Sequence, residues 1–288
     1  MIPSGFEYHR PADVAGALSI LQEHGDDARV IAGGHSLIPM MKLRMADVDH
    51  LIDLQDIDAL KGISIGTDEV TIGAMVTQHE LIENDALAQA VPIIREAALV
   101  IADPQVRYVG TIGGNVANGD PGNDMPGLMQ CLDARFELVG PDGTREVPAR
   151  EFYEAAYFTA REDEEILTKV IIPVPAAGTG QAYEKQKRKI GDYATAAAGV
   201  MIQTEGEVCT ATSIAMTNLA DTPVWCEAAS DALVGSSLSD VDCKTAVMLA
   251  LGDIEPVADN RGPVEFKKHV AGVILRRAID RAIARASN

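Results

Sequence analysis

The N-terminal third of the chain combines apolar runs with one helical stripe, a pattern that predicts a small parallel β-unit. Asp13 precedes apolar residues at helical spacing over 14–21, and Gly25 follows them, which is typical of a capped helix with a glycine stop. Apolar runs at 29–31 and 50–54 predict strands on either side of a second helix. Since parallel strands need a crossover connection, this third is predicted to be a βαβ unit.

The pattern then changes to short strands joined by turns, which predicts a larger, mostly antiparallel part. Apolar runs pair around glycine-containing turns, and a longer run of β-branched residues follows. These runs are residues 63–65 with 70–72, residues 136–139 with 146–147, and residues 165–172. Thr77 and Glu80 have the spacing of a capping box, so a helix is predicted to begin there.

A segment rich in proline, alanine and glycine, residues 173–180, predicts a boundary between two domains. Beyond it, apolar runs at 195–202 and 208–216 predict two antiparallel strands. The predicted helices that follow are residues 224–229, residues 241–250, and a last one with an apolar stripe of Phe266, Val270, Val273, Ile274 and Ala278. We therefore predict an N-terminal domain over residues 1–177, divided into 1–54 and 55–177, and a C-terminal domain over 178–288.

Composition narrows the function classes without naming one. The 288 residues include 24 Lys and Arg against 43 Asp and Glu, a net charge of −19. This acidic surplus disfavours nucleic acid and anionic membrane surfaces as partners. The N-terminal residues lack the basic and apolar regions of a signal peptide, and no apolar run reaches the roughly 18 residues of a membrane span. A cytoplasmic location is therefore expected.

The sequence contains no recognisable metal or nucleophile pattern. Its four cysteines have no C-x-x-C spacing, and its six histidines stand in no metal-ligand pattern. No candidate nucleophile stands beside a base. We therefore expect neither a metal site nor catalytic residues in this chain, and no iron–sulfur cluster bound by it.

Two glycine-containing stretches are the strongest candidates for binding chemistry. The first is Ala32, Gly33, Gly34, His35 and Ser36, and the second is Thr111, Ile112, Gly113, Gly114 and Asn115. Glycine leaves no Cβ between backbone and ligand, so backbone N–H groups and the polar side chains beside them can point at an anion. A single Gly-Gly pair is usually an ordinary turn, and neither stretch matches the dinucleotide fingerprint or the phosphate loop. The presence of two similar stretches favours binding of one long ligand with two phosphates by both of them.

The second stretch lies in a loop-like region, residues 102–124, that ends at the start of a predicted helix. Long ordered loops usually serve binding. Asp124, at the end of this region, has two open interpretations. It is either the N-cap of the helix or a carboxylate that accepts hydrogen bonds from ribose hydroxyls, and the two roles are compatible.

These stretches, with the run Asp120–Asp124, Lys185 and the segment 191–195, resemble the FAD-binding medium subunit of the molybdenum hydroxylases, the xanthine dehydrogenase family. The likeness covers essentially the whole chain. It implies an α+β fold, with a two-part FAD-binding domain of the vanillyl-alcohol-oxidase type (the βαβ unit and a larger, mostly antiparallel part) and a C-terminal α+β domain. The cofactor-binding positions that it implies are both glycine stretches together with Ile101, Asp124, Leu167, Lys185 and Tyr193.

Within that family, Gly110 and the Gly191–Thr195 run resemble the medium subunits of aerobic, molybdenum-containing carbon monoxide dehydrogenases. The resemblance implies that FAD in this chain receives electrons from two [2Fe-2S] clusters of a small subunit and passes them to a quinone. A large subunit with molybdopterin, molybdenum and copper would oxidise CO with water to CO2. A dimer of heterotrimers is implied, and a quinone acceptor is compatible with a peripheral position at the inner face of the cell membrane.

Alternatives remain open. A related complex acting on a purine, an aldehyde or another heterocycle would use the same subunit design, a stand-alone flavin reductase would need its own proton donor, and an interaction scaffold would bind no flavin. Leu167 is either core or a flavin contact, and Lys185 is either a surface lysine or a cofactor ligand. Tyr193 could shield one flavin face by stacking. His79 is expected to be a surface residue of a helix first turn, and the basic run Lys187–Lys189 a solvated face or a partner contact.

Overall fold

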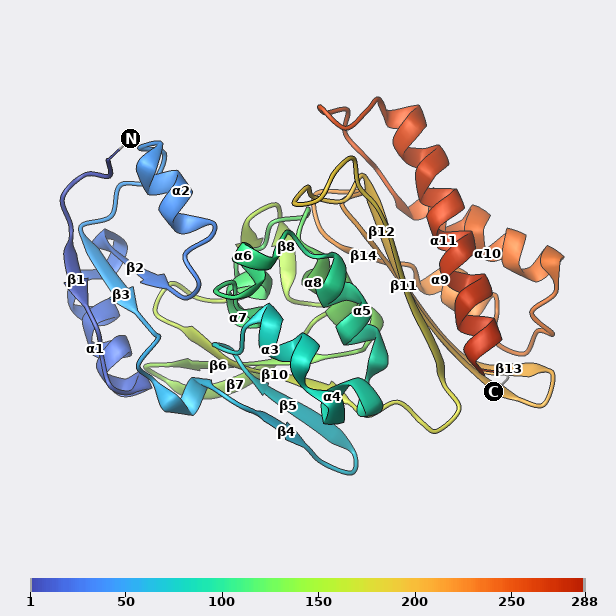
Figure 1. Ribbon diagram of the computed structural model, residues 1–288, viewed down its shortest axis with the longest axis horizontal. Coiled ribbons are helices and arrows are strands. Elements are labelled where there is room, and N and C mark those ends of the chain that lie inside the picture. Colours follow the sequence, from blue (N-terminus) through green and yellow to red (C-terminus); the bar gives the residue numbers. More distant parts are fainter. Residues whose placement is uncertain (1, 287–288) are drawn as a thin grey trace.

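The computed structural model describes residues 2–286 as three parts placed side by side along the long axis of the molecule (Figure 1). A βαβ unit stands at one end, and a five-stranded sheet with short helices occupies the middle. A four-stranded sheet backed by the C-terminal helices forms the other end. The predicted α+β architecture is confirmed.

The first part is a three-stranded parallel sheet in the order β1-β3-β2. Its elements are β1 (Glu7–His9), α1 (Val14–His24), β2 (Ala28–Ile31), α2 (Leu37–Lys42) and β3 (His50–Asp53), with 3-10 turns at Gly25–Asp27 and Asp58–Leu60. The Asp13 carboxylate caps α1 by accepting from Gly16 N, and Gly25 ends the helix at φ 51°, as predicted. Strand β1 was not predicted, because its three residues are mostly exposed and include a single apolar side chain, that of Tyr8.

The middle sheet is antiparallel, in the order β4-β5-β10-β6-β7. Its strands are β4 (Ile63–Ile65), β5 (Glu69–Gly73), β6 (Arg135–Gly140), β7 (Gly143–Pro148) and β10 (Ile166–Pro173). A small two-stranded sheet comprises β8 (Tyr153–Ala155) and β9 (Phe158–Thr159). Both predicted hairpins and the strand rich in β-branched residues are confirmed.

Six helices lie over one face of the middle sheet (Figure 1). They are α3 (Gln78–Glu83), α4 (Asp85–Ala90), α5 (Pro92–Val100), α6 (Pro104–Arg107), α7 (Ile112–Ala117) and α8 (Asp124–Cys131). Thr77 and Glu80 form the predicted capping box of α3. Fully buried side chains from the helices, such as Ile94 and Leu128, pack with Phe136 of the sheet and join the two layers in one core.

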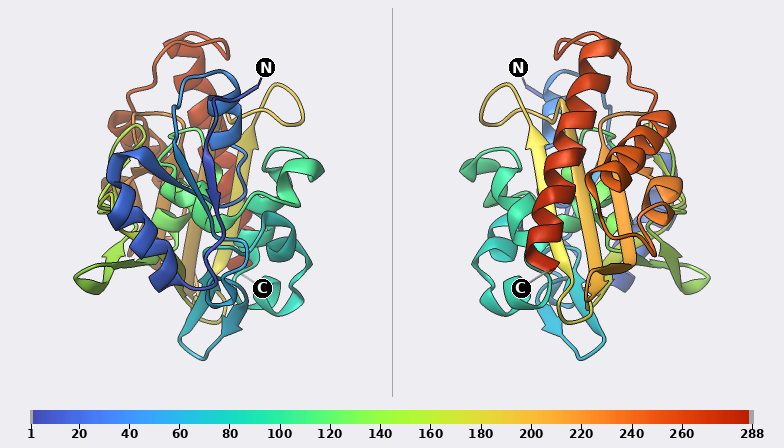
Figure 2. Two further views of the ribbon diagram at one scale, coloured as in Figure 1. Left: turned by 90° about the vertical axis from the view of Figure 1, so that its left-hand side faces the viewer. Right: turned by 90° about the vertical axis from the view of Figure 1, so that its right-hand side faces the viewer.

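The third part is an antiparallel sheet in the order β11-β12-β13-β14, with helices on both faces. Its elements are β11 (Gly180–Gln186), β12 (Ala196–Glu205), β13 (Val208–Thr217), β14 (Val224–Trp225), α9 (Glu227–Asp231), α10 (Asp240–Asp253) and α11 (Val264–Ala286). Helix α8 packs on the inner face, and α11 crosses the outer face (Figure 2). A Cβ on Gly180 would overlap the Ala282 carbonyl of α11, so this close approach requires glycine.

All four cysteines are reduced and buried, and three of them lie in the core of this third part. The fourth, Cys131, ends α8 and contacts the Ser213 carbonyl of β13. Burial raises the pKa of Cys131 to about 12. Burial also raises the pKa of Cys226 to about 12.

Three predicted elements differ from the structure. Residues 224–229 hold β14 followed by α9, because Trp225 pairs with Ala215 at the sheet edge. The core face of α11 is formed mainly by small and aliphatic residues that fit its close approach, whereas Phe266 and Val273 of the predicted stripe are exposed. Residues 102–124 contain α6 and α7, so this region is only partly a loop. No helix among residues 2–286 is both long and apolar enough to cross a bilayer.

Candidate cofactor-binding site

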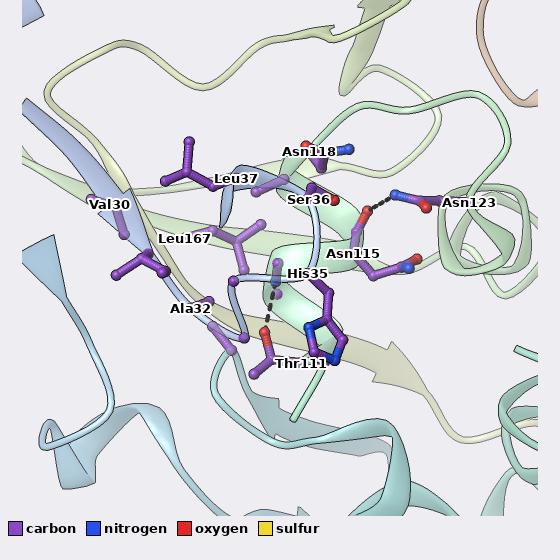
Figure 3. A pocket seen from close by; sticks show the side chains of 18 of the residues that line it. Val30, Ala32, His35, Ser36, Leu37, Thr111, Asn115, Asn118, Asn123 and Leu167 are labelled. Atoms are coloured by element: carbon purple, nitrogen blue, oxygen red, sulfur yellow. Dashed lines mark hydrogen bonds between the residues drawn. The ribbon is translucent and has the colours of Figure 1, made fainter. Parts of the chain in front are cut away.

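A cavity of about 790 Å³ lies where the three parts of the chain meet (Figure 3). Its volume is in the range of about 300–1,000 Å³ that small-molecule sites occupy. Every predicted cofactor-binding residue except Ile112 lines it. These residues are Ala32, Gly33, Gly34, His35, Ser36, Ile101, Thr111, Gly113, Gly114, Asn115, Asp124, Leu167, Lys185 and Tyr193.

The first glycine stretch is the turn between β2 and α2. A Cβ on Gly33 would overlap the Val109 carbonyl, and Gly34 adopts φ 70°, so both positions require glycine. Among residues 2–286, no acceptor contacts the backbone N–H groups of Gly33, Gly34, His35 or Ser36. The Ser36 side chain makes no capping hydrogen bond either. Successive free N–H groups on one turn form a concavity suited to an anion.

The second glycine stretch touches the first but is built differently. A Cβ placed on Gly114 would lie 3.4 Å from the Ala32 Cβ, so the two stretches are neighbours. The N–H groups of Ile112 and Gly113 donate to carbonyls of residues 74–76, at 2.8 and 2.9 Å, and the Gly114 N–H donates to Thr111 Oγ1 at 3.0 Å. The expectation that both stretches offer free backbone N–H groups is therefore wrong for the second. Its residues begin α7, where the Thr111 N-cap and the carbonyls of the segment that follows β5 already accept from them.

The second stretch still presents polar side chains to the cavity (Figure 3). The Thr111 hydroxyl accepts from Gly114 N and keeps its own hydrogen for another acceptor. Asn115 Oδ1 accepts from Met125 N at 3.2 Å, which orients the side-chain NH2 group. Asn123 Nδ2 donates to the Asn115 carbonyl at 2.9 Å and ties α8 to α7.

Asp124 is the centre of a buried polar cluster at the start of α8. It is 4% exposed, and the N-cap of α8 is Asn123, so the interpretation of Asp124 as the N-cap is wrong. Its Oδ2 accepts from Lys185 Nζ at 2.7 Å, and its Oδ1 accepts from the Tyr183 hydroxyl at 2.7 Å. Burial, and then the charge of Asp124, raises the pKa of Tyr183 well above its usual value. Lys185 is not a surface lysine, because its side chain is only 2% exposed.

Two cations of the predicted basic run bind the chain itself. Lys187 Nζ donates to the Val100 carbonyl at 2.9 Å, beside Lys185. Burial, and then the neighbouring Lys185 charge, lowers the pKa of Lys187. Arg188 Nε donates to Asp192 at 2.8 Å and Nη1 to the Asn260 carbonyl at 2.8 Å. Lys187 is half-buried, so its side chain does not lie on a solvated face, whereas the Arg188 side chain stays 45% exposed, as a solvated face requires.

Tyr193 lies at the mouth of the cavity and is 41% exposed. Its ring packs against Gly122, where an added Cβ would come within 2.9 Å of Tyr193 Cδ1. The Arg261 guanidinium lies 5.5 Å from the ring centroid and also donates to Asp192 at 3.1 Å. Burial opposes ionisation of Asp192, but hydrogen bonds from Arg188 and Arg261 outweigh it and lower the Asp192 pKa. Contacts with Gly122 on one side and with Arg188 and Arg261 on the other therefore hold the segment that carries Tyr193.

Comparisons with known proteins agree with this geometry. Residues 4–175 match the family of FAD binding domains in molybdopterin dehydrogenase, and residues 181–282 match the CO dehydrogenase flavoprotein C-terminal domain. The chain belongs to the family of FAD-binding medium subunits of molybdenum hydroxylases. It is 57% identical to the carbon monoxide dehydrogenase medium chain of Afipia carboxidovorans over the full length of both chains. It is 43% identical to that of Hydrogenophaga pseudoflava, again over the full length of both.

A solved structure of a Cu,Mo-CO dehydrogenase in its cyanide-inactivated form contains a chain with the same fold. It superposes with a TM-score of 0.97 at 57% sequence identity, covering 99% of this chain and 100% of that one. The predicted fold, a two-part FAD-binding domain followed by a C-terminal flavoprotein domain, is therefore confirmed.

The structure also places three further residues considered in the sequence analysis, Ile112, Leu167 and His79. Ile112 does not line the cavity, because its side chain is fully buried in the core and its N–H is already bonded. Leu167 is 5% exposed and both belongs to the core and lines the cavity, so its two interpretations coexist. The His79 ring packs 4.1 Å from the Tyr108 ring.

Several residues that line the cavity were not predicted from the sequence, and Gln78 is one of them. Gln78 is 2% exposed, and neither Oε1 nor Nε2 has a hydrogen-bond partner among residues 2–286. Sequence shows it only as the first residue of a helix. Its burial beside the cavity is set by a tertiary contact of α3 with the residue before the second glycine stretch, in which Gln78 N donates to the Gly110 carbonyl at 2.9 Å.

Proposed function

We propose that this chain binds FAD in the cavity and serves as the medium subunit of a carbon monoxide dehydrogenase that contains molybdenum and copper. The observation that carries the proposal is the row of free N–H groups at Gly33, Gly34, His35 and Ser36, beside a cavity of dinucleotide size. A pyrophosphate is an anion that needs such donors. The full-length identity with two carbon monoxide dehydrogenase medium chains supports CO as the substrate of the complex.

The cavity residues divide into groups with different proposed tasks. The first glycine stretch holds the pyrophosphate with its N–H groups and the Ser36 hydroxyl, and Thr111 and Asn115 donate from the second stretch. Each Asp124 oxygen accepts one internal hydrogen bond and has a further lone pair for a ligand hydroxyl. Ile101 and Leu167 supply apolar contact, and Tyr193 covers one face of the ring system.

When bound, FAD supplies the ability to exchange electrons singly with iron–sulfur clusters and in pairs with an organic acceptor. This chain would bind and orient it between its partners. We propose a large subunit with molybdopterin, molybdenum and copper, and a small subunit with two [2Fe-2S] clusters, assembled as a dimer of heterotrimers. We also propose a quinone acceptor, a cytoplasmic location at the inner membrane face, and domains over 1–177 and 178–288.

The function is tested on the native complex by its visible spectrum under anaerobic conditions. Adding CO should bleach flavin and iron–sulfur absorbance together, and a soluble quinone should restore both. Bleaching by xanthine or an aldehyde, with no response to CO, would reassign the substrate. A colourless complex, or a flavin chain that purifies without partner subunits, would contradict the proposed electron-transfer role.

The site is tested separately by FAD content. Gly33→Val places a side chain against the Val109 backbone and should release FAD, whereas Gly5→Val is the matched control because nothing lies within 4 Å of its added Cβ. Stoichiometric FAD in folded Gly33→Val protein would argue against the assignment of the pyrophosphate to this turn. Circular dichroism confirms that both variants fold.

A further inference from the structure

We propose that His9, His24 and His50 form a binding site for a divalent transition-metal ion, at the end of the βαβ unit. The sequence predicted no such site, because these residues are far apart along the chain. The fold brings them together from β1, the end of α1 and the start of β3. One ligand nitrogen from each ring lies within 4.8 Å of the other two.

The spacing suits a small metal ion. His9 Nε2 lies 3.1 Å from His50 Nδ1. Two nitrogens bound to a tetrahedral Zn²⁺ at about 2.0–2.1 Å are about 3.3 Å apart. A fourth ligand is at hand, because Glu7 Oε2 lies 3.7 Å from His50 Nδ1 and Glu7 is paired with His50 in the β1–β3 register. Three imidazoles and one carboxylate favour zinc, copper or nickel over calcium or magnesium.

The stacked rings must turn before they can bind a shared ion. His24 and His50 are stacked, with centroids 3.6 Å apart and planes 8° apart, whereas ligation requires each ring to aim its lone pair at a shared ion. All three side chains are only partly buried, so the rotation disturbs no core packing. A bound ion would join β1 and β3 to α1 and stabilise the unit that carries the first glycine stretch.

The test uses the full chain and Zn²⁺ in equilibrium dialysis at neutral pH. Wild type should bind one Zn²⁺, and His24→Gln or His50→Gln should weaken binding by at least tenfold, since even residues behind metal ligands change affinity about 10–100-fold. His269→Gln, on α11, is the matched control and should bind like wild type. At a free Zn²⁺ concentration of about 100 times Kd, the unfolding temperature of wild type should rise by about 5–10 °C.

A second measurement needs no variant. Co²⁺ added to wild type should give the visible bands of a tetrahedral site with nitrogen ligands, and Zn²⁺ should remove them. No saturable binding, binding equal in wild type and both cluster variants, or an octahedral Co²⁺ spectrum without nitrogen ligation would each overturn the proposal.

An independent observation carries a second inference, which rests on the proposed FAD site. We infer that Gln78 is a cofactor-binding residue, and that its side-chain amide bonds a donor–acceptor group of FAD. Gln78 lines the cavity and is 2% exposed, yet both polar atoms of its amide lack partners among residues 2–286. Such groups are rare in native structures and mark a missing partner.

If the Gln78 amide binds FAD, its removal should lower FAD affinity without lowering the stability of the FAD-free chain, which a purely structural role would not do. Gln78→Leu keeps the size of the side chain but removes the amide, so it should weaken FAD binding by about two- to tenfold per lost hydrogen bond. The same change should leave the stability of the FAD-free chain equal or higher, because no internal bond is lost. Gln130→Leu is the control: Gln130 is also buried with an unpartnered Oε1 but does not line the cavity, so FAD affinity should not change.

Affinity is measured by fluorescence titration of the deflavinated full chain with FAD. Unchanged affinity in Gln78→Leu, or a loss of stability in its FAD-free form, would refute the inference while leaving the proposed function intact. Failure of the wild-type chain to bind FAD would instead refute the proposed function.

Discussion

At the residue scale, burying the cluster of Asp124, Lys185 and Tyr183 costs desolvation free energy, but the hydrogen bonds within the cluster hold its side chains in one arrangement. A carboxylate and an ammonium taken out of water must recover their hydration through contacts of good geometry. Both Asp124 oxygens have a donor at 2.7 Å, and Lys185 also donates to the Val100 carbonyl at 3.3 Å. The cluster therefore fixes the carboxylate before any ligand arrives.

Tyr183→Phe should destabilise the chain by about 1.5–3 kcal/mol, the range for a hydrogen bond to a charged group. Tyr153→Phe is a matched control, because Tyr153 is partly buried and its hydroxyl is shielded from solvent but has no partner among residues 2–286. Urea unfolding of both variants checks this. Equal losses for the two variants would mean that the bond from Tyr183 to Asp124 contributes nothing measurable.

Lys185→Met should cost more, about 3–5 kcal/mol, because it leaves a buried carboxylate without its counter-charge. Asp124→Asn combined with Lys185→Met should recover part of that loss, since neither partner is then charged. A double-mutant cycle from denaturant unfolding measures the coupling. Strictly additive losses would show that the two groups are not paired in solution.

Residue identities were predictable where the backbone or a family motif demands them, as at Gly33, Gly34 and Lys185. Contacts made across the fold were not. Gln78 and the three histidines reveal nothing in sequence, because their significance comes from neighbours on other elements. Asp124 stood where an N-cap is expected, and only the positions of Tyr183 and Lys185 on one face of β11 reveal its actual partners.

At the scale of elements, a turn of the C-terminal part holds the segment that carries Tyr193. Arg261 bonds Asp192 at 3.1 Å and Asp259 at 3.1 Å, and the buried Lys267 bonds Asp259 at 2.9 Å. Burial raises the pKa of Asp259, but hydrogen bonds from Lys267 and Arg261 outweigh it and lower the pKa overall. The turn before α11 therefore acts as an anchor for the cavity mouth.

This anchor predicts a pH dependence. The pKa values of Asp192 and Asp259 are depressed in the folded chain, so their stabilisation is present above the unfolded value of about 3.9 and is lost as pH falls through the folded values. In Arg261→Ala, the free energy of unfolding should therefore fall less steeply than in wild type as the pH drops below about 4. Denaturant unfolding between about pH 6 and 3 measures it, with the exposed Arg277→Ala as control. Identical profiles for wild type and Arg261→Ala would contradict the role of the anchor.

Elements with strong local signals were predictable, and those decided by packing were not. The capping box of α3 and the two hairpins follow from residues close in sequence. The core face of α11 depends on how closely the helix approaches the sheet, which selects alanines that carry little apolar signal. The two glycine stretches look alike in sequence but differ in structure. Only in the second do the backbone N–H groups donate to the segment that follows β5 and to the Thr111 N-cap of a helix.

At the scale of the whole molecule, all three parts contribute walls to one cavity. A ligand bound there should stabilise the chain as a unit, by about 2.7 kcal/mol at 100 times its Kd, or about 5–10 °C in unfolding temperature. Calorimetry with FAD should show this shift. Riboflavin lacks the phosphates that the first glycine stretch would hold, so it should bind more weakly, and an equal shift with riboflavin would argue against phosphate recognition.

The burial of the reduced cysteines affects how they react with oxidants formed near a redox cofactor. A flavin that meets oxygen releases peroxide, which attacks the thiolate form of cysteine. With the pKa of Cys131 and of Cys226 raised to about 12, almost none of either side chain is thiolate at neutral pH. The packing that joins the sheets and helices therefore protects the Cys131 and Cys226 thiols from oxidation by peroxide.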